Sequence, residues 1–560
     1  MSEREKNLIL LSILGLAFVL RVWAIGFGLP YDFTPDEVHE IVRALKLGTG
    51  EYSWTPGKGG LYLFLFVEYG LLYVFWWITG QVNGPTDFAL AYLQDPTAFY
   101  LAGRITVAVM GTATCYVIYL IGKRLYDWRI GLAAAFIGAT AHYHGLWSHY
   151  INVDIGMTLA LWAAILAYIV YEKDPKLRWL IAAGALGGIS FAFKSPGAIV
   201  AVPLLLAIAT PFDKWSRPRK PVREASIVML SMLITSLAVA PENVLSFGKF
   251  AEQFSSLLGG DGVAASADAF DKSVKDVTVF RGGSYLKILF RDTNIALTLA
   301  ALLGVMVAFR RRERWDLIWV ALIAVFMGVM ILADRPGEQR YLLPIIPALW
   351  LLGARAATVI TGTRTRLLPI AMAIIVAVPA FALVQQNHSW TRPDTRVLTK
   401  DWIESNVPPG SKFLMDGMRF RFIHSPPLQP DEITVNRRID RAEAAGSVSR
   451  GISGGTLELY AKAMRRMSGP KYELHSTIYG LKVRELSYYI DECFDYIVTS
   501  SQNSNRFLSA EAAERYPTSA SFYQDLPTDI RFEKIFSATP APWRVQGPEI
   551  NVYKVLSNCE

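Results

Sequence analysis

The sequence is poor in charge and in cysteine, and both shortages exclude classes of protein. Only 19% of its 560 residues are charged and 52% are hydrophobic, which is too little charge for a water-soluble chain of this length. Its three cysteines form no CxxC motif and no Cys/His cluster, which argues against a structural zinc site. Cys115 lies in an apolar run, whereas Cys493 and Cys559 lie in a polar tail and could pair in a disulfide.

The chain also lacks a glycine-rich phosphate loop in a strand–helix context, so no nucleotide site is predicted. The net charge of +8 does not indicate nucleic-acid binding. The basic residues gather in short loops between apolar runs, as the topology of membrane proteins requires. We therefore predict no nucleic-acid partner.

What the chain has instead is a series of long apolar runs. A run of about 17–22 residues can cross a bilayer core of about 30 Å as a helix. The first run has no small-residue cleavage site and is followed by others, so we interpret it as a retained anchor. Hydropathy predicts about eleven spans, near residues 8–27, 100–122, 131–147, 157–171, 179–194, 196–212, 225–241, 287–309, 316–333, 341–360 and 367–385.

One apolar segment, Leu61–Thr79, does not fit the charge pattern of the loops. With the N-terminus inside, the basic loops lie on one face of the membrane, and a full crossing here would move the loop at Lys123–Arg129 outside. We therefore interpret this segment as a helix that lies at the interface or re-enters the membrane. Its many aromatic residues suit the headgroup level, and an ordinary span stays the alternative.

The composition turns polar from Gln386 onward. Strand-like segments are Lys412–Asp416, Phe494–Thr499 and Ile550–Val555, and a helix is predicted to end near Trp402–Gly410. The predicted fold is an α-helical polytopic membrane protein with about eleven spans, interfacial helices in the first outer loop and a C-terminal soluble α/β domain. We place the transmembrane catalytic domain at 1–385 and the extracytoplasmic domain at 386–560.

The candidate site residues are charged side chains at the outer ends of the predicted spans. Carboxylates at a membrane boundary are costly, which favours a functional interpretation. Lysine and arginine at this boundary suit the phosphate of a lipid, and a nearby carboxylate suits a general base. The residues are Asp36, Glu37, Lys58, Arg104, Asp154, Lys194 and Arg340.

Each candidate also has a structural interpretation. The segment Thr34–Glu37 resembles a helix start, in which Thr34 caps and Glu37 is the third residue. Arg104 could be an interface anchor, and Lys194 could extend its charge out of an apolar run. His144 and His149 could be interfacial polar residues or ligands.

The chain resembles the polytopic glycosyltransferases of the C-type fold that use lipid-phosphate sugars, in particular the protein O-mannosyltransferase and lipid A aminoarabinose transferase families. In chain order, the segments that carry the resemblance are Asp36-Glu37, Pro56–Tyr62, Arg104–Gly111, Ser148–Asp154, Gly187–Lys194, Arg340–Pro347 and Asp401–Gly410. Where the family often has His-Pro-Pro or Lys-Pro-Pro, this chain has Lys58-Gly59-Gly60.

The resemblance implies an inverting transfer of a monosaccharide, hexose or pentose, from a polyprenyl-phosphate donor. The acceptor is a hydroxyl or phosphate of a protein, lipid or glycan on the outer face. Asp36 would be the base, with Glu37 and Asp154 as further acidic residues. Lys58, Arg104, Lys194 and Arg340 would lie near the lipid phosphate.

We expect no cofactor, although a divalent metal at Asp36, Asp154 and a histidine stays open. We place the protein in a prokaryotic plasma membrane, with the N-terminus in the cytoplasm and the site outside. Two alternatives are a transporter of an anionic or lipid-linked solute and a non-catalytic scaffold. A transporter would need charged groups near the middle of the membrane.

Overall fold

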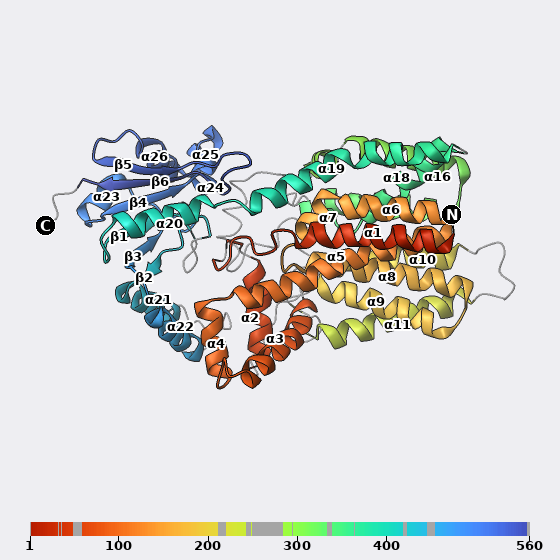
Figure 1. The fold of residues 1–560 in the computed structure, drawn as a ribbon, viewed down its shortest axis with the longest axis horizontal. Helices are drawn as coiled ribbons and strands as arrows, with labels where there is room; N and C mark the ends of the chain where they lie inside the picture. Colours follow the sequence, from red (N-terminus) through yellow and green to blue (C-terminus); the bar gives the residue numbers. More distant parts are fainter. Residues whose placement is uncertain are drawn as a thin grey trace.

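A computed structural model describes residues 2–31, 33–34, 36–48, 59–210, 220–241, 248, 284–293, 295–332, 339–362, 364–417, 423–444 and 454–556. Within these residues the chain forms a long helical bundle followed by a smaller α/β domain (Figure 1). The predicted helical, polytopic fold with a C-terminal α/β unit is confirmed.

Six of the described helices are long and apolar enough to cross a membrane. They are α3 (Leu61–Ile78), α5 (Thr97–Leu125), α8 (Val153–Lys173), α11 (Pro221–Val239), α17 (Arg314–Leu332) and α19 (Leu368–Trp390). Other bundle helices are α1 (Glu3–Val22), α6 (Trp128–Thr140), α9 (Leu177–Phe193), α10 (Ala201–Ala209), α16 (Ile295–Arg311) and α18 (Ile346–Thr361). The number of spans stays a prediction.

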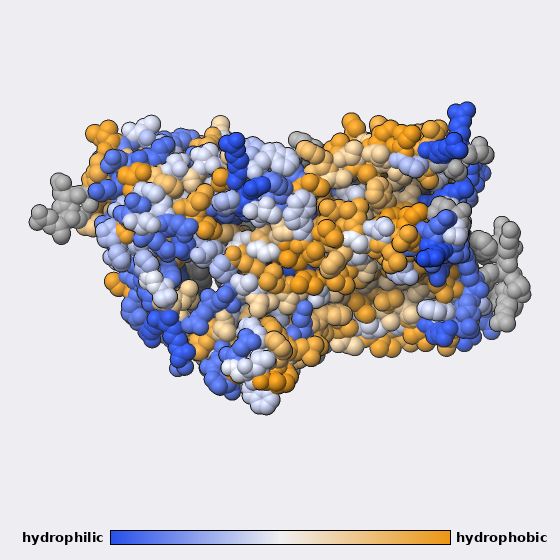
Figure 2. Space-filling model, in the orientation of Figure 1, coloured by the Kyte–Doolittle hydropathy of each residue, from blue (hydrophilic) through white to orange (hydrophobic). Residues whose placement is uncertain are grey.

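The bundle exposes large apolar side chains along its flanks. Examples are Leu8 and Leu11 on α1 and Ile370 and Ile374 on α19, all more than half exposed. Figure 2 shows these flanks as a mainly hydrophobic band, with hydrophilic residues gathered at the far end of the bundle and over the α/β domain. A surface of this kind is stable in contact with lipid.

Several predicted spans have different boundaries in the structure; for example, the span 287–309 falls on α15 (Ser284–Thr293) and α16 (Ile295–Arg311). The first helix ends at Val22 rather than near residue 27. The predicted span 131–147 is broken at Ala141, where α6 ends and the short α7 (His142–Trp147) begins. The guanidinium of Arg21 donates to the carbonyls of Gly138 and Ala139 at 2.9 and 3.3 Å. Because these carbonyls bond to Arg21, the helix can end there without leaving them unpaired.

The helix α3 has both ends at the same end of the bundle. At its start, the Gly59 N–H donates to the carbonyl of Phe193, the last residue of α9. At its end it leads into α4 (Pro85–Gln94), which packs against α22 (Gly454–Arg466) of the α/β domain. The single carboxylate of α3, Glu68, accepts a hydrogen bond from Thr106 of α5 at 3.0 Å. This arrangement fits the interfacial interpretation of the segment.

The opposite end of the bundle carries the basic loops. Lys173 donates to the carbonyl of Arg124, and Arg314 forms an ion pair with Glu172 at 2.6 Å. On the same end, Arg355 pairs with Asp316 at 3.4 Å. These contacts join loops that are distant in the sequence, so we call this end the basic end.

The α/β domain contains one six-stranded sheet in the order β2-β3-β1-β4-β6-β5. The strands β1 (Lys412–Met415), β3 (Lys471–Ser476) and β4 (Tyr496–Ser500) are parallel neighbours. The strands β6 (Ile550–Val555) and β5 (Phe532–Ala538) continue the sheet antiparallel. The predicted strands correspond to β1, β4 and β6, whereas β3, β5 and the short β2 (Gln429–Pro430) were not predicted.

Helix α19 connects the two parts. It continues to Trp390, and α20 (Thr395–Asn406) follows after a short turn (Figure 1). Trp390 stacks on Phe27 with ring centroids 4.3 Å apart. The predicted domain boundary at residues 385/386 stays a prediction. Cys493 is disulfide-bonded and Cys115 is free, whereas Cys559 lies outside the described residues.

Candidate active site

Asp36 lies at the start of α2 (Glu37–Leu47) and forms an ion pair with Arg340 of η2 (Gln339–Leu342). The side chain of Asp36 is 43% exposed and that of Arg340 is 14% exposed. Asp36 is the N-cap residue of α2, but its side chain makes no capping hydrogen bond. Its carboxylate is therefore available to Arg340 and to solvent.

Asp154 and Lys194 form a second and more buried pair. Lys194 Nζ donates to both carboxylate oxygens of Asp154, at 2.8 and 3.0 Å. Asp154 lies in the first turn of α8, and its N–H donates to the side chain of the N-cap residue Asn152. Lys194 is the C-cap residue of α9 and has an extended backbone, which ends the helix here. A buried pair of this kind needs both partners, because either charge alone would be strongly destabilising.

The ring of Tyr341 lies near the cations of both pairs. Lys194 Nζ is 4.7 Å and the Arg340 guanidinium carbon 5.8 Å from the centroid of this ring. Arg340 also lies 5.4 Å from the ring centroid of Trp147. Cations within about 6 Å of an aromatic ring are attracted by about 0.5–2 kcal/mol. Asp36, Arg340, Tyr341, Lys194 and Asp154 are therefore in continuous contact, and we call them the charged cluster.

Sequence reasoning missed both aromatic residues of this site. Tyr341 follows Arg340 directly at the start of a predicted span, and Trp147 stands at the end of another. Aromatic residues are common at span ends, so their position alone carried no distinguishing signal.

The third pair, Glu37 and Arg104, is almost fully buried. Arg104 Nε and Nη2 donate to the two carboxylate oxygens of Glu37, each at 2.8 Å. Its Nη1 donates to the carbonyls of Ile25 and Phe27. Glu37 also accepts the N–H of Ile151 at 3.0 Å. The pair therefore holds together the loop before α2, helix α5 and the segment before α8.

The predicted helix cap at Thr34 is wrong in detail. Helix α2 begins at Glu37, so Glu37 is the first residue of the helix rather than the third. The Thr34 hydroxyl donates to Glu37 Oε2 at 2.5 Å instead of bonding to a backbone N–H. The reason is that the Glu37 carboxylate is held by Arg104, which makes it the nearest strong acceptor.

The direction of the helices places all three pairs at the end of the bundle that faces the α/β domain. Helix α8 starts near Asp154 and reaches the basic end at Lys173, and α9 returns from there to Lys194. Six of the seven predicted site residues thus lie together, in pairs of opposite charge. Lys58, the seventh, lies outside the described residues.

The two histidines that the sequence left open are buried in the bundle. His144 Nδ1 is 3.0 Å from Arg21 Nη2, and His149 Nε2 is 3.2 Å from the Trp23 carbonyl. These two partners lie outside the charged cluster. In the described part of the chain, no group of three or more His, Cys, Asp or Glu side chains could hold a metal ion.

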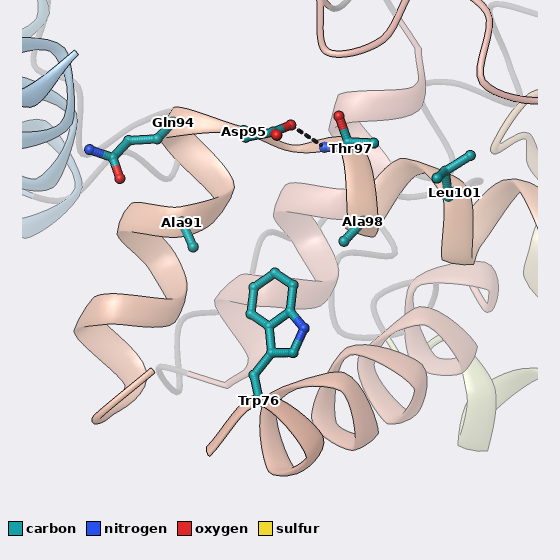
Figure 3. Close-up of a pocket in the computed structure, with 7 residues that line it drawn as sticks. All are labelled: Trp76, Ala91, Gln94, Asp95, Thr97, Ala98 and Leu101. Atoms are coloured by element: carbon teal, nitrogen blue, oxygen red, sulfur yellow. Dashed lines mark hydrogen bonds between the residues drawn. The ribbon is translucent and has the colours of Figure 1, made fainter. Parts of the chain in front are cut away.

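A separate cavity of about 490 Å³ lies between α3, α4 and the start of α5. Figure 3 shows the Trp76 ring below Ala91 and Ala98, with Asp95 accepting the Thr97 N–H at 3.0 Å. No lysine or arginine lines it. Because a phosphate needs cationic or N–H donors, this cavity does not suit the phosphate of a lipid donor.

Residues 99–239 match the family model described as dolichyl-phosphate-mannose-protein mannosyltransferase. No curated protein matches the chain by sequence. The Archaeoglobus fulgidus oligosaccharyltransferase, tethered to an acceptor peptide, matches with a TM-score of 0.50 and 11% identity, covering 96% of this chain and 73% of that chain. ArnT from Cupriavidus metallidurans bound to undecaprenyl phosphate has a TM-score of 0.49 and 12% identity, covering 98% of this chain and 99% of that chain.

At such low identity, the likeness to the Archaeoglobus oligosaccharyltransferase concerns the fold alone. The expected resemblance to the C-type glycosyltransferases is confirmed at this level. Together with the six helices that are long and apolar enough to span, this fold makes the chain an integral membrane protein of the C-type glycosyltransferase fold.

Proposed function

We propose that this chain is a membrane glycosyltransferase that moves a monosaccharide from a polyprenyl-phosphate donor to a hydroxyl or phosphate acceptor. The acceptor belongs to a protein, a lipid or a glycan. The observation that carries the proposal is the charged cluster at one end of the bundle. It combines an exposed carboxylate with two cations beside a lipid-facing surface.

The cations of the cluster suit the donor phosphate. Arg340 offers paired N–H donors that match two phosphate oxygens, and Lys194 offers a compact charge. The apolar flanks of the bundle would keep the prenyl chain in lipid while its phosphate reaches the cluster. The family-model match over residues 99–239, which includes Arg104, Asp154 and Lys194, supports the same class of donor.

In the proposed reaction, the acceptor hydroxyl oxygen attacks the anomeric carbon of the donor sugar. The bond between this carbon and the phosphate oxygen breaks, and the polyprenyl phosphate leaves with the electron pair. Asp36 takes the hydroxyl proton, because its carboxylate is the most exposed acid of the site. Arg340 and Lys194 stabilise the negative charge that develops on the leaving phosphate. Direct attack from the opposite face inverts the anomeric centre.

The structure suggests a revised role for Arg104 and Glu37. Four N–H groups of the Arg104 guanidinium already bond to Glu37, Ile25 and Phe27. Arg104 would therefore hold the Asp36 loop in place rather than bind the phosphate. Glu37 would act as its anchor, and Asp154 would orient Lys194 toward the donor.

The proposal extends to location and chemistry. The basic end would face the cytoplasm by the positive-inside rule, so that the charged cluster and the α/β domain lie outside. A prokaryotic plasma membrane stays our proposed location.

We propose a mannose-like hexose or a pentose as the sugar and no resident cofactor. The transporter alternative lacks support, since the acid–cation pairs gather at one end of the bundle rather than at mid-membrane.

The direct test is transfer by the purified protein in lipid nanodiscs. Radiolabelled polyprenyl-phosphate mannose and pentose donors would be combined with peptide, lipid and glycan acceptors. We expect transfer from one donor class, and Asp36→Asn should lower its rate about 10²–10⁴-fold. Asp87→Asn, which removes a partly exposed carboxylate on α4, should leave the rate unchanged. A folded protein that transfers no sugar from any lipid donor would contradict the proposal.

A further inference from the structure

We infer that Arg396, in the α/β domain, is a positioning residue for the loop that carries Asp36. This inference rests on the proposed function of Asp36. It implies that the α/β domain does more than border the acceptor side, because it also fixes the geometry of the proposed base. The argument starts from the loop between α1 and α2.

The first half of this loop is held by the bundle. The carbonyls of Ile25 and Phe27 accept hydrogen bonds from Arg104 at 2.8 and 2.9 Å. The Phe27 ring lies between the Arg104 guanidinium, 4.1 Å from its centroid, and the stacked ring of Trp390. Residues up to Phe27 are therefore anchored to α5 and α19.

The second half of the loop meets the α/β domain. The Arg396 guanidinium carbon lies 3.7 Å from the ring centroid of Phe33. Lys400, one turn further along α20, lies 5.9 Å from the ring of Tyr31. Phe33 precedes Asp36 by three residues, so the position of this ring limits where the Asp36 carboxylate can lie.

Arg396 is itself rigidly held. Its Nε and Nη2 donate to the two oxygens of Asp394, the N-cap residue of α20, at 2.8 and 2.7 Å. Its Nη1 donates to the carbonyl of Ile423 at 2.7 Å. The side chain is only 12% exposed. A planar guanidinium fixed on both edges presents its face to Phe33 with little loss of side-chain entropy on contact.

The topology of the sheet explains why Arg396 faces the bundle. Thr395, at the start of α20, bonds to Gln546 and Pro548, just before β6. Because β6 is antiparallel to β4, the start of β6 lies at the carboxyl end of β4. The carboxyl ends of the parallel strands therefore share one edge with the start of α20, and this edge faces the loop that contains Phe33.

The consequence concerns the rate of the chemical step. A displacement of about 1 Å in a reacting group can lower a rate by about 100-fold. Loss of the Arg396–Phe33 contact frees the loop next to Asp36 and leaves Arg340, Lys194 and the donor site intact. We therefore expect kcat to fall by a much larger factor than any change in the KM for the lipid donor.

The test compares Arg396→Ala, Phe33→Leu and the double variant with wild type. Each single variant should lower kcat about 10- to 100-fold, and the double variant should be no slower than the worse single variant. Arg437→Ala is the matched control, since Arg437 bonds to Glu473 and the Leu474 carbonyl within the α/β domain. Independent, additive effects of the two single variants, or an equal effect of the control, would overturn the inference.

A second measurement needs no activity. Hydrogen exchange of peptides that cover residues 36–47 should be faster in Arg396→Ala than in wild type or Arg437→Ala. Unchanged exchange would overturn the inference even if the enzyme is active. If wild type transfers no sugar but exchange rises as expected, the proposed function fails and the contact between domain and loop stands.

Discussion

At the level of single residues, Asp36 differs from Glu37 and Asp154 in how far water reaches its carboxylate. The side chains of Glu37 and Asp154 are 1% and 2% exposed, whereas that of Asp36 is 43% exposed. A buried ion pair is costly to open, but a partly exposed pair exchanges partners readily. Arg340 can therefore leave Asp36 for a phosphate, which would release Asp36 to act as the base.

This exchange predicts opposite effects of two substitutions on donor binding. Asp36→Asn removes the competitor for Arg340, so a polyprenyl phosphate should bind about two- to fivefold more tightly, given about 0.5–1 kcal/mol for a partly exposed pair. Arg340→Ala should weaken binding, and Arg366→Ala at the basic end should not change it. Equilibrium binding in nanodiscs measures all three. Weaker binding by Asp36→Asn would show that the pair does not compete with phosphate.

His424 of the α/β domain predicts a pH dependence of stability. Burial lowers its pKa from 6.5 to about 4, and its Nδ1 is 2.6 Å from Asn503 Oδ1. Below pH 6.5 the His424 side chain of the unfolded chain binds a proton, whereas that of the folded domain stays neutral down to about pH 4. The free energy of unfolding should therefore fall as the pH falls from 6.5 to about 4, by about 3 kcal/mol in total.

Thermal unfolding of wild type and His424→Asn at pH 7.5, 6 and 5 measures this effect. Asparagine keeps an N–H donor for Asn503 but cannot titrate. The difference in Tm between the two proteins should shrink as the pH falls, because only wild type loses stability through this group. A difference that stays constant with pH would contradict the prediction.

The sequence predicted which charged residues gather at one end of the bundle but not which of them pair. Asp36, Asp154, Lys194 and Arg340 are charged residues at span ends, so topology alone placed them together. Their partners depend on the rotation and depth of packed helices, which no local pattern contains. Arg21 is an example of a contact that the sequence does not predict. It donates to the carbonyls of two α6 residues that lie 117 and 118 positions further along the chain.

At the level of elements, α9 and α11 pack closely at two glycines. A Cβ atom at Gly184 would lie 2.4 Å from the Val228 carbonyl oxygen, and one at Gly188 would lie 2.3 Å from the Met232 carbonyl oxygen. The spacing of four residues places both glycines on one helix face. Small residues at this spacing let two membrane helices approach through their backbones.

Gly188→Ala should therefore destabilise the bundle. The added methyl group would force α11 away from α9, at a cost of about 1–3 kcal/mol typical of overpacking. Gly15→Ala is the matched control, because a Cβ atom there meets nothing within 4 Å. Thermal unfolding in detergent should show a lower Tm for Gly188→Ala only. Equal Tm values would mean that the two helices are not held by this contact.

Elements with a strong local sequence pattern were predicted well. Elements whose boundaries depend on contacts with distant residues were not. The strand at Lys412–Met415 follows a helix end and a Pro-Pro-Gly turn, signals that the sequence displays directly. The strand β5 places two exposed polar residues side by side, so its periodicity is weak, whereas β3 alternates polar and apolar residues and was missed despite this signal. The break of the span at Ala141 depends on Arg21, a residue of another helix.

At the level of the whole molecule, the two ends of the bundle differ in their chemistry. The basic end joins its loops through Lys173, Arg314 and Arg355. The other end carries the charged cluster and receives the α/β domain through Trp390 and Arg396. The positive-inside rule then gives one orientation for the entire chain.

This orientation is tested with single cysteines in a background without the three native ones. Gln81→Cys lies in the turn between α3 and α4, and Lys176→Cys lies in the exposed loop between α8 and α9. A membrane-impermeant maleimide applied to intact cells should label Gln81→Cys but not Lys176→Cys, which should react only after permeabilisation. Both sites lie beside apolar helices. The control is therefore the reaction of the two cysteines with the maleimide in detergent, where both should react at similar rates. If neither cysteine reacts in intact cells, the ends of α3 lie on opposite faces of the membrane. Labelling of Lys176→Cys from outside would reverse the bundle, and the α/β domain would then lose its place beside an extracytoplasmic site.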